Sequence, residues 1–398
     1  MIEGRNIICI ASNWWYDPTS KHHVMKLLAE RNHVVWVNYH GSRRPRVAAV
    51  DARAIAGKLR QFIDGPRQVE ENITVVTPMV IPLPGSRAAA NLNRRLLSRQ
   101  IKSVLRSLPP RPVQLWTFAP DVDYLAGRFG EECVVYYCVD EFSEFAGYDR
   151  DAILAAEAKL AARADLVITT STSLYQAKRR LSVDAILVTH GVDYDNFAGP
   201  QGETPAPELA EHKRPILGFW GLIQDWVDTD LIAAIARLRP DWSVVLIGEA
   251  LADTTELARV PNVHLLGRRP YAHLPAYAAA FDVGIIPFRI NNLTRAVNPI
   301  KLREYLSAGL PVVSTPLPEV QRYEPWVMLA DSPERFVVAC ERAIETNSAS
   351  LAHARRERML SETWRSKVEG ISDHLRRVLS GTSSAVSASS TALSPIAG

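Results

Sequence analysis

The sequence predicts an α/β protein made of two domains, each built on a mainly parallel sheet. The chain has 398 residues, which is more than one ordinary hydrophobic core supports. Apolar strands alternate with helical patterns on both sides of a Gly- and Pro-rich stretch at 198–214, which has the composition of a linker. We therefore place the first domain at residues 1–200 and the second at 213–361.

The first half begins with an apolar strand at 6–11, a helical stretch at 20–31 and a second strand at 33–38. Strands that alternate with helices favour parallel pairing, because the helix returns the chain to the same end of the sheet. The other elements expected in this half are strands at 73–77, 113–118, 133–139, 166–170 and 185–189, with the clearest helix at 150–164.

The second half repeats this alternation, and its helix over 299–308 has the clearest limits. Asn298 can cap that helix, Pro299 suits its first position and Gly309 ends it. Sheets of this kind bind ligands beyond the carboxyl ends of their strands, so a loop at Gly221 and this helix belong at the same edge. The other elements expected here are strands at 215–220, 243–248, 262–266, 282–287 and 311–315, and helices at 228–238 and 271–280.

The composition narrows the functional classes. Hydrophobic residues make up 47% of the chain and charged residues 22%, as in soluble globular proteins, and a net charge of +3 is too small to indicate nucleic acid binding. No apolar run approaches the roughly 18 residues needed to cross a membrane. Residues 1–12 lack the apolar segment of a signal peptide, and the four scattered cysteines favour a reducing cytoplasm. We expect residues 381–398, rich in Ser, Thr, Ala and Gly, to be disordered.

Lys301 and Glu304 are three residues apart, so they project from one face near the start of their helix. A helix N-terminus favours anions, and a lysine there can neutralise a diphosphate. One turn on, a carboxylate can accept hydrogen bonds from two adjacent ribose hydroxyls. The alternative is an exposed ion pair on an ordinary helix.

The run from Asn298 to Val313, Asn-Pro-Ile-Lys-Leu-Arg-Glu-Tyr-Leu-Ser-Ala-Gly-Leu-Pro-Val-Val, resembles the donor-binding signature of bacterial polysaccharide and teichuronic-acid glycosyltransferases. These enzymes have the GT-B architecture, two Rossmann-like domains that face each other across a cleft. The resemblance extends to four further segments: Gly218-Phe219-Trp220-Gly221-Leu222-Ile223, residues 261–267, residues 281–287, and His190-Gly191-Val192-Asp193 with Phe197.

The resemblance implies transfer of a sugar from a nucleoside diphosphate, with a UDP-sugar favoured, to a hydroxyl of a saccharide or lipid-linked glycan in surface polysaccharide synthesis. It implies that Gly221 approaches a phosphate, that Arg268, Arg269 and Tyr271 lie where relatives line a nucleobase pocket, and that Asn298 lies close to the donor. The alternatives are a plain turn at Gly221 and a solvated basic turn after Gly267. A helix at 362–380 is expected to cross back to the first domain. We expect no cofactor, and no metal if Lys301 and its helix neutralise the leaving diphosphate.

Asp140 follows the apolar strand at 133–139 and is the candidate catalytic residue. A carboxylate at that strand end faces the cleft and can take the proton from an acceptor hydroxyl. The alternatives are a helix cap, a loop acid, or a group that only holds the acceptor. Many retaining relatives carry a second carboxylate eight positions before the one that matches Glu304, and this chain has Ala296 there. The stereochemical outcome therefore stays open.

Three tryptophans near strand ends, Trp14, Trp15 and Trp116, are the acceptor-side candidates. An indole at a strand end can stack on a sugar ring, and it can equally pack beneath the domain interface. His22 and His23 are close to Trp14 and Trp15 but have no spaced partners, so we do not expect them to bind metal.

Residues 86–108 form a basic amphipathic helix, with arginines such as Arg94, Arg95 and Arg99 on one side and leucines at near-helical spacing on the other. Such a helix can lie on an anionic membrane surface, which would make this cytoplasmic protein peripheral at the inner face of the membrane. The alternative is a helix packed on the core with a basic outer face.

Two other functions compete with glycosyl transfer. A sugar-nucleotide epimerase of the same architecture would use the same cleft without a second substrate. A degenerate transferase could instead serve as a binding or scaffold subunit, a reading that Ala296 favours and that Lys301 and Glu304 oppose. A dehydrogenase is disfavoured, because no Gly-x-Gly-x-x-Gly follows an early strand.

Overall fold

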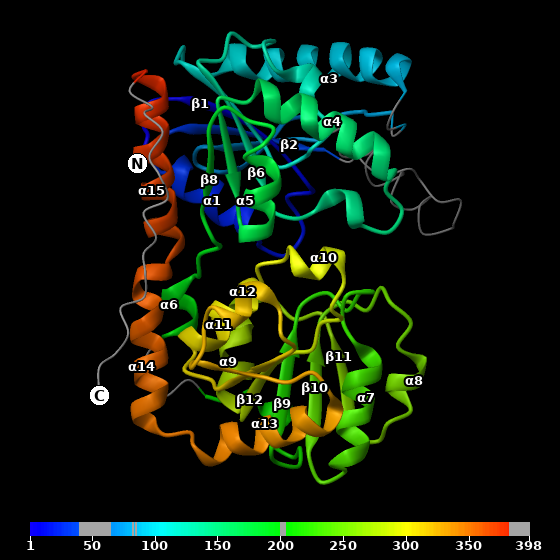
Figure 1. Cartoon of the computed structure of the whole chain (residues 1–398). Coiled ribbons are helices and arrows are strands. Elements are labelled where there is room, and N and C mark those ends of the chain that lie inside the picture. Colours follow the sequence, from blue (N-terminus) through cyan, green and yellow to red (C-terminus); the bar gives the residue numbers. More distant parts are fainter. Residues whose placement is uncertain (40–64, 82, 84–85, 200–203, 382–398) are drawn as a thin grey trace.

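The structure is a computed structural model that describes residues 1–39, 65–81, 83, 86–199 and 204–381. Figure 1 shows two α/β domains, one above the other, with two long helices along one side of both. This arrangement confirms the predicted fold class, including the last helix that returns to the first domain. Of the tail expected at 381–398, residues 382–398 lie outside the described residues.

The first domain holds an eight-stranded sheet in the order β3-β4-β2-β1-β5-β6-β7-β8. Every described pair is parallel except β3–β4, which is antiparallel. The sequence did not predict β3, because Arg67-Gln68-Val69-Glu70 is a short and mostly exposed edge strand without an apolar run. The bounds are β1 Asn6–Ala11, β2 His33–Asn38, β3 Arg67–Glu70, β4 Ile73–Val76, β5 Val113–Thr117, β6 Cys133–Cys138, β7 Leu166–Thr169 and β8 Ala185–Leu187.

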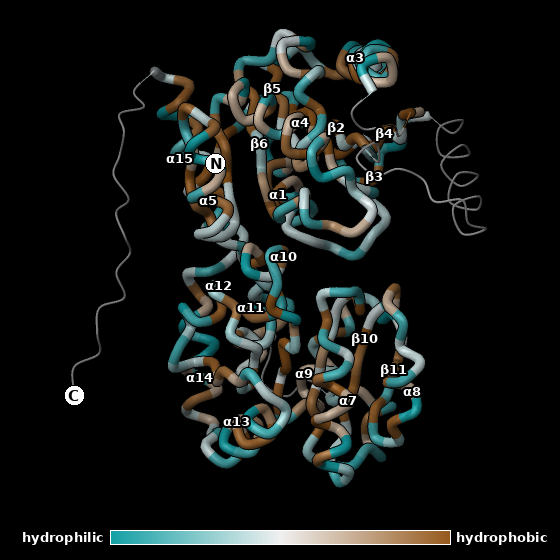
Figure 2. The backbone as a smooth tube through the Cα atoms, turned by 45° about the vertical axis from the view of Figure 1, so that its right-hand side comes forward, coloured by the Kyte–Doolittle hydropathy of each residue, from teal (hydrophilic) through white to brown (hydrophobic). Residues whose placement is uncertain are grey.

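Helices cover both faces of this sheet because successive residues of each strand point to opposite sides. In β1, Ile7 and Cys9 belong to the cluster under α1 and the C-terminal helix α15 (Trp364–Leu379), whereas Ile8 and Ile10 belong to the cluster under α3 and α4. Figure 2 shows hydrophobic colour concentrated on the inner strands. The helices are α1 Ser20–Ala29, α3 Arg87–Ser107, α4 Arg150–Arg163, α5 Thr172–Lys178 and α6 Tyr194–Phe197.

The second domain holds a six-stranded parallel sheet in the order β11-β10-β9-β12-β13-β14. The chain runs outward from β9 to β11 and then returns to place β12 beside β9, so the strand order reverses between these two strands. Ligands of open parallel sheets bind at such a point. The strands are β9 Ile216–Trp220, β10 Ser243–Ile247, β11 Val263–Gly267, β12 Val283–Ile286, β13 Val312–Ser314 and β14 Val327–Leu329. The helices are α7 Thr229–Leu238, α8 Thr255–Ala258, α9 Leu274–Ala280, α10 Asn292–Arg295, α11 Ile300–Ser307, α12 Pro318–Gln321 and α13 Pro333–Glu345.

The chain crosses between the domains twice, and the two crossings lie side by side. The Val192 amide donates to the Glu362 carbonyl at 2.9 Å, and the Trp364 amide donates to the Val192 carbonyl at 3.2 Å. At Gly191 an added β-carbon would lie 2.7 Å from the Trp364 Cα, so only glycine allows this approach.

The second crossing leads into the helix expected at 362–380, which is observed as α15. A 3-10 turn at Leu360–Glu362 separates α14 Ala349–Met359 from α15 Trp364–Leu379. Helix α14 packs on α11 of the second domain and α15 on α1 of the first. Within the described part of the chain, no helix is long and apolar enough to cross a membrane.

Candidate active site

Gly221 follows β9 at the point where the strand order reverses. Its φ of +127° lies in a region that favours glycine, and its amide donates to the Ile247 carbonyl at 2.9 Å. Gly248, with φ +145°, packs directly on this residue, since a β-carbon there would come within 1.9 Å of the Gly221 carbonyl oxygen. Two glycines thus bring bare backbone together at the carboxyl ends of β9 and β10.

Lys301, in the first turn of α11, reaches the backbone of Gly221. Its Nζ atom lies 3.4 Å from the position of a β-carbon on Gly221. The ammonium lies 5.1 Å from the ring centre of Phe219 and 4.8 Å from that of Phe288, and no ion pair among the described residues includes it. Burial lowers the pKa of Lys301 to about 8, while Glu304 acts to raise it. The site therefore presents a desolvated cation that is still mostly protonated at neutral pH.

Glu304 lies one turn further along α11, in an aromatic surround. The Trp220 indole N–H donates to its Oε2 atom at 2.7 Å, and the Tyr271 hydroxyl lies beside the same carboxylate. Burial raises the pKa of Glu304, and the Trp220 hydrogen bond and Lys301 oppose that rise. The structure thus brings Gly221, Tyr271, Lys301 and Glu304 together around one end of the sheet.

A cavity of about 540 Å³ opens beside this cluster, at the carboxyl ends of β9, β10 and β11. Its size is within the usual range for small-molecule sites. Arg268 on its rim also donates to Asp17 of the first domain at 2.7 Å, so the rim is an interdomain contact. The cavity is lined by Ile223, Gly248, Glu249, Ala250, Leu265, Gly267 and Arg268.

Two expected donor residues have other partners in the structure. Arg269 pairs with Glu208 at 2.9 Å and also contacts Tyr277, so Arg268 rather than Arg269 lines the cavity. Both arginines follow the end of β11, and motif spacing does not resolve which of them faces the cavity. Asn298 is buried, accepts from Arg303 at 2.6 Å and donates to Glu319 at 3.2 Å. The prediction that it caps this helix was wrong, because α11 begins at Ile300 with Pro299 as its N-cap and no side-chain hydrogen bond caps it.

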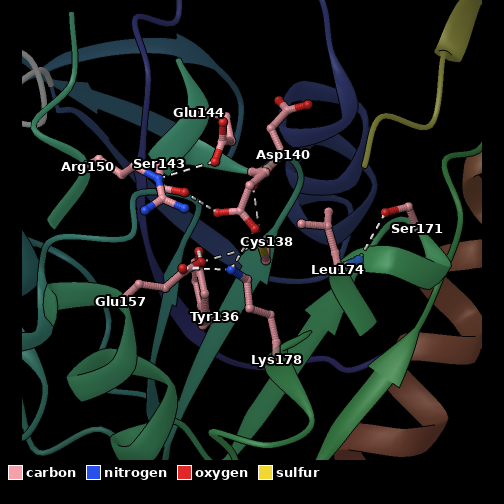
Figure 3. A network of polar contacts seen from close by, with 11 residues as sticks. Tyr136, Cys138, Asp140, Ser143, Glu144, Arg150, Glu157, Ser171, Leu174 and Lys178 are labelled. Atoms are coloured by element: carbon pink, nitrogen blue, oxygen red, sulfur yellow. Dashed lines mark hydrogen bonds and ion pairs between the residues drawn. The ribbon is translucent and has the colours of Figure 1, made fainter. Parts of the chain in front are cut away.

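Asp140 lies at the carboxyl end of β6, as expected, and is half-buried. Burial raises the pKa of its carboxyl group to about 7; Lys21 at the start of α1 lowers it and Glu141 raises it. Figure 3 shows the Asp140 carboxylate pointing away from the ion pairs behind it. A carboxylate with a pKa near 7 can accept a proton and release it again at neutral pH.

A buried ion-pair network supports the turn that carries Asp140 (Figure 3). The Lys178 ammonium, only 2% exposed, donates to Glu157 at 2.7 Å and to Glu141 at 3.2 Å. The Tyr136 hydroxyl donates to the other oxygen of Glu157 at 2.6 Å. Sequence reasoning missed this network because its members lie on separate elements and form no local motif.

Two of the three candidate tryptophans are not at the cleft surface. Trp116 is fully buried in β5, and its indole donates to Gln114 at 3.0 Å. Trp14 packs in the core against His22 and Trp36. Trp15 is 40% exposed, with the Arg67 guanidinium over its ring. An apolar residue at a strand end can point to the cleft or to the core, and here Trp14 and Trp116 point to the core.

The residue that replaces a carboxylate of many relatives, Ala296, ends the short helix α10. It is 3% exposed and belongs to the same apolar cluster as Ile10 and Leu115 of the first domain. Its methyl group is thus part of the interdomain contact. Among the described residues, no group of three or more His, Cys, Asp or Glu side chains is placed to hold a metal ion.

Residues 214–346 match the sequence family described as Glycosyl transferases group 1. The chain resembles the group 1 glycosyl transferases. The match covers the second domain, in which Gly221, Lys301 and Glu304 converge, and it confirms the resemblance drawn from the motifs.

A curated relative extends this resemblance into the first domain. The chain is 29% identical over 253 residues to the Bacillus subtilis (strain 168) protein TuaH, named for glycosyl transfer in teichuronic acid biosynthesis. The aligned part is 58% of this chain and spans just under two thirds, 64%, of TuaH.

Solved structures confirm the GT-B fold over nearly the whole chain. Sucrose-phosphate synthase from Thermosynechococcus elongatus superposes with a TM-score of 0.70 at 14% identity, over 95% of this chain and 100% of that one. Anabaena Alr3699/HepE in complex with UDP and glucose gives 0.66 at 15% identity, over 93% and 99%. The Escherichia coli trehalose-6-phosphate protein bound with UDP-2-fluoro glucose gives 0.63 at 11% identity, over 94% and 99%.

Proposed function

We propose that this protein is a glycosyltransferase that moves a sugar from a UDP-sugar to a hydroxyl of a saccharide or lipid-linked glycan during surface polysaccharide synthesis. The observation that carries the proposal is the position of Lys301, a desolvated cation against the bare backbone of Gly221 where the strand order reverses. UDP is favoured as the nucleotide because HepE was solved with UDP and glucose. Surface polysaccharide synthesis is favoured because TuaH is named for teichuronic acid biosynthesis.

The proposed chemistry needs one bond to form and one to break. The acceptor oxygen bonds to the anomeric carbon, the bond from that carbon to the diphosphate oxygen breaks, and the acceptor proton passes to Asp140. Lys301 and the N-terminus of α11 neutralise the diphosphate as it leaves, which would allow the reaction without a metal. Direct displacement of this kind inverts the anomeric carbon. Retention would instead need the donor phosphate to accept the proton, with Asp140 only holding the acceptor.

We propose further that α3 places the enzyme on the inner face of the cell membrane. The helix buries Leu97, Ile101 and Val104 against the sheet, so its packing on the core is established. Its outer face still exposes Leu92 and Leu96 by 43% and 38%. Basic side chains lie along the same stripe, at Arg95, Arg99, Lys102 and Arg106. Exposed leucines flanked by arginines suit an anionic lipid surface.

Calorimetry with UDP, followed by a hydrolysis assay with UDP-glucose, tests the proposed activity. A glycosyltransferase should bind UDP, and Lys301→Ala should weaken that binding about tenfold or more, as expected for the loss of a charged hydrogen bond. Conversion of the sugar nucleotide into an isomer without any acceptor would instead identify an epimerase. Failure of the folded wild-type protein to bind UDP, UDP-glucose or another nucleoside diphosphate would leave only a scaffold.

A further inference from the structure

Four aromatic side chains from both domains form a continuous cluster beside Asp140. Phe142 and Phe145, on the loop after β6, have ring centres 5.9 Å apart, and Tyr148 follows 5.8 Å from Phe145. Trp226, on the loop after β9 of the second domain, meets Phe145 edge-on at 6.0 Å. The cluster thus joins the loop of the proposed base to the loop that begins at Gly221.

Both loops are held in place by polar contacts. The Phe142 amide donates to the Asp140 carbonyl at 3.1 Å, and the Ser143 hydroxyl donates to Glu141 at 2.8 Å. On the other side, the Arg289 amide donates to the Trp226 carbonyl at 2.9 Å. The rings are therefore held on fixed turns, which lowers the entropy cost of binding a ligand on their faces.

The exposure of these rings separates them from the core aromatics. Trp220, Phe281 and Tyr305 of the second domain are each less than 5% exposed. All four rings of the cluster are only partly buried, so each keeps some surface open to solvent. Charged groups stand at its rim, where Arg150 donates to Glu144 at 3.3 Å. Apolar faces with a few fixed polar groups around them are typical of small-molecule sites.

We infer that Phe145, Tyr148 and Trp226 form a subsite for the acceptor, which takes a pyranose ring. The inference rests on the proposed function, because a hydroxyl attacking the donor must lie between Asp140 and the phosphate site at Gly221. The contact between Phe145 and Trp226 joins the loop after Asp140 to the loop after Gly221. The apolar C–H face of a pyranose packs on an aromatic ring, and its hydroxyls reach the charged rim. This subsite replaces the buried Trp14 and Trp116 as the place where an acceptor sugar is recognised.

Saturation-transfer NMR on the protein–UDP complex tests the subsite with methyl pyranosides as probes and sorbitol, which has hydroxyls but no ring, as the comparison. The pyranosides should receive saturation and sorbitol should not. Phe145→Ala and Trp226→Ala should each weaken pyranoside binding about tenfold, a typical value for the loss of one stacking contact. Trp226→Phe should retain most of it. Tyr175→Ala, which removes a partly exposed ring on α5, should change nothing.

The UDP dissociation constant and the thermal midpoint are measured for every variant. The expected result is weakened pyranoside binding with unchanged UDP binding and stability. The inference is overturned if the wild-type complex binds no pyranoside, if Phe145→Ala and Trp226→Ala leave binding intact, or if Trp15→Ala alone abolishes it. It is also overturned if UDP and pyranoside binding fall together, since the rings would then only hold the domains. Failure of the wild type to bind UDP would count against the proposed function instead.

Discussion

The Trp220 indole donates to the Glu304 carboxylate at 2.7 Å, and this bond joins the end of β9 to the middle of α11. The two residues are 84 positions apart in the chain, so only the folded domain brings them together. The contact orients the carboxylate expected to receive the ribose hydroxyls.

Glu304→Ala should therefore weaken UDP binding about tenfold or more, since a charged hydrogen bond contributes roughly 1.5–3 kcal/mol. Glu304→Gln is the matched control, because it keeps an oxygen for the Trp220 N–H and loses only the charge. Calorimetry with UDP, beside the thermal midpoint of each variant, separates binding from folding. Unchanged affinity in folded Glu304→Ala would remove Glu304 from the donor site.

The pH dependence of kcat/KM should be bell-shaped, because turnover needs Asp140 deprotonated and donor binding needs Lys301 protonated. Burial raises the pKa of Asp140 to about 7, and a base must be deprotonated, so turnover should fall as the pH drops below 7. Burial lowers the pKa of Lys301 to about 8, and the lysine must be protonated to hold a diphosphate, so UDP affinity should fall above pH 8. Lys301→Arg should move the alkaline limb upward because a guanidinium stays charged. Constant UDP affinity between pH 7 and 10 would contradict the role of Lys301.

Asp140→Asn should keep the fold and the UDP affinity and lose turnover by about 100- to 10,000-fold, the usual effect of removing a positioned base. The anomeric configuration of the product, read by NMR, complements the rate. Inversion of the anomeric carbon together with a large rate loss supports the role of Asp140 as the base. Retention with near-normal turnover would reject it.

Helix α3 should bind vesicles that contain anionic lipids and not neutral ones, and salt should release it. Replacing Arg94, Arg95 and Arg99 by Gln should abolish sedimentation with the vesicles. Replacement of Arg259, Arg335 and Arg376, three exposed arginines elsewhere, is a control with the same change in net charge. Equal loss in both variants would show that net charge, not this helix, governs binding.

Lys178→Met should destabilise the first domain by about 3–5 kcal/mol, because it leaves the buried Glu157 carboxylate without its cation. Arg150→Gln removes an exposed ion pair to Glu144 on the same loop and should cost less than about 1 kcal/mol. Urea unfolding followed by tryptophan fluorescence gives both values. A similar small loss in both variants would mean that the Lys178 network does not hold the turn at Asp140.

Local patterns predicted the features that depend on local order. Strand alternation gave the two sheets, and the spacing of Lys301 and Glu304 placed both on one helix face. The edge strand at Arg67–Glu70 was not predicted, because an exposed strand has no apolar signal.

Tertiary context decided the rest. Whether Trp116 faces the cleft or the core depends on what packs against β5. Which of Arg268 and Arg269 lines the cavity depends on the backbone conformation after β11. The Lys178 network joins residues 21 and 37 positions apart, which no local motif encodes. Ala296 illustrates the same limit, since its contact with the first domain appears only after folding.

The bonds between Val192 and the segment at Glu362–Trp364 tie both domain crossings into one pivot. We therefore expect any relative motion of the domains to be a rotation about that pivot rather than a slide along it. Asp140 and Lys301 lie in different domains, so one angle would set the gap between the proposed base and the proposed diphosphate site. A single opening rotation would therefore admit both substrates and release both products. The reaction itself would take place only when the two domains are closed.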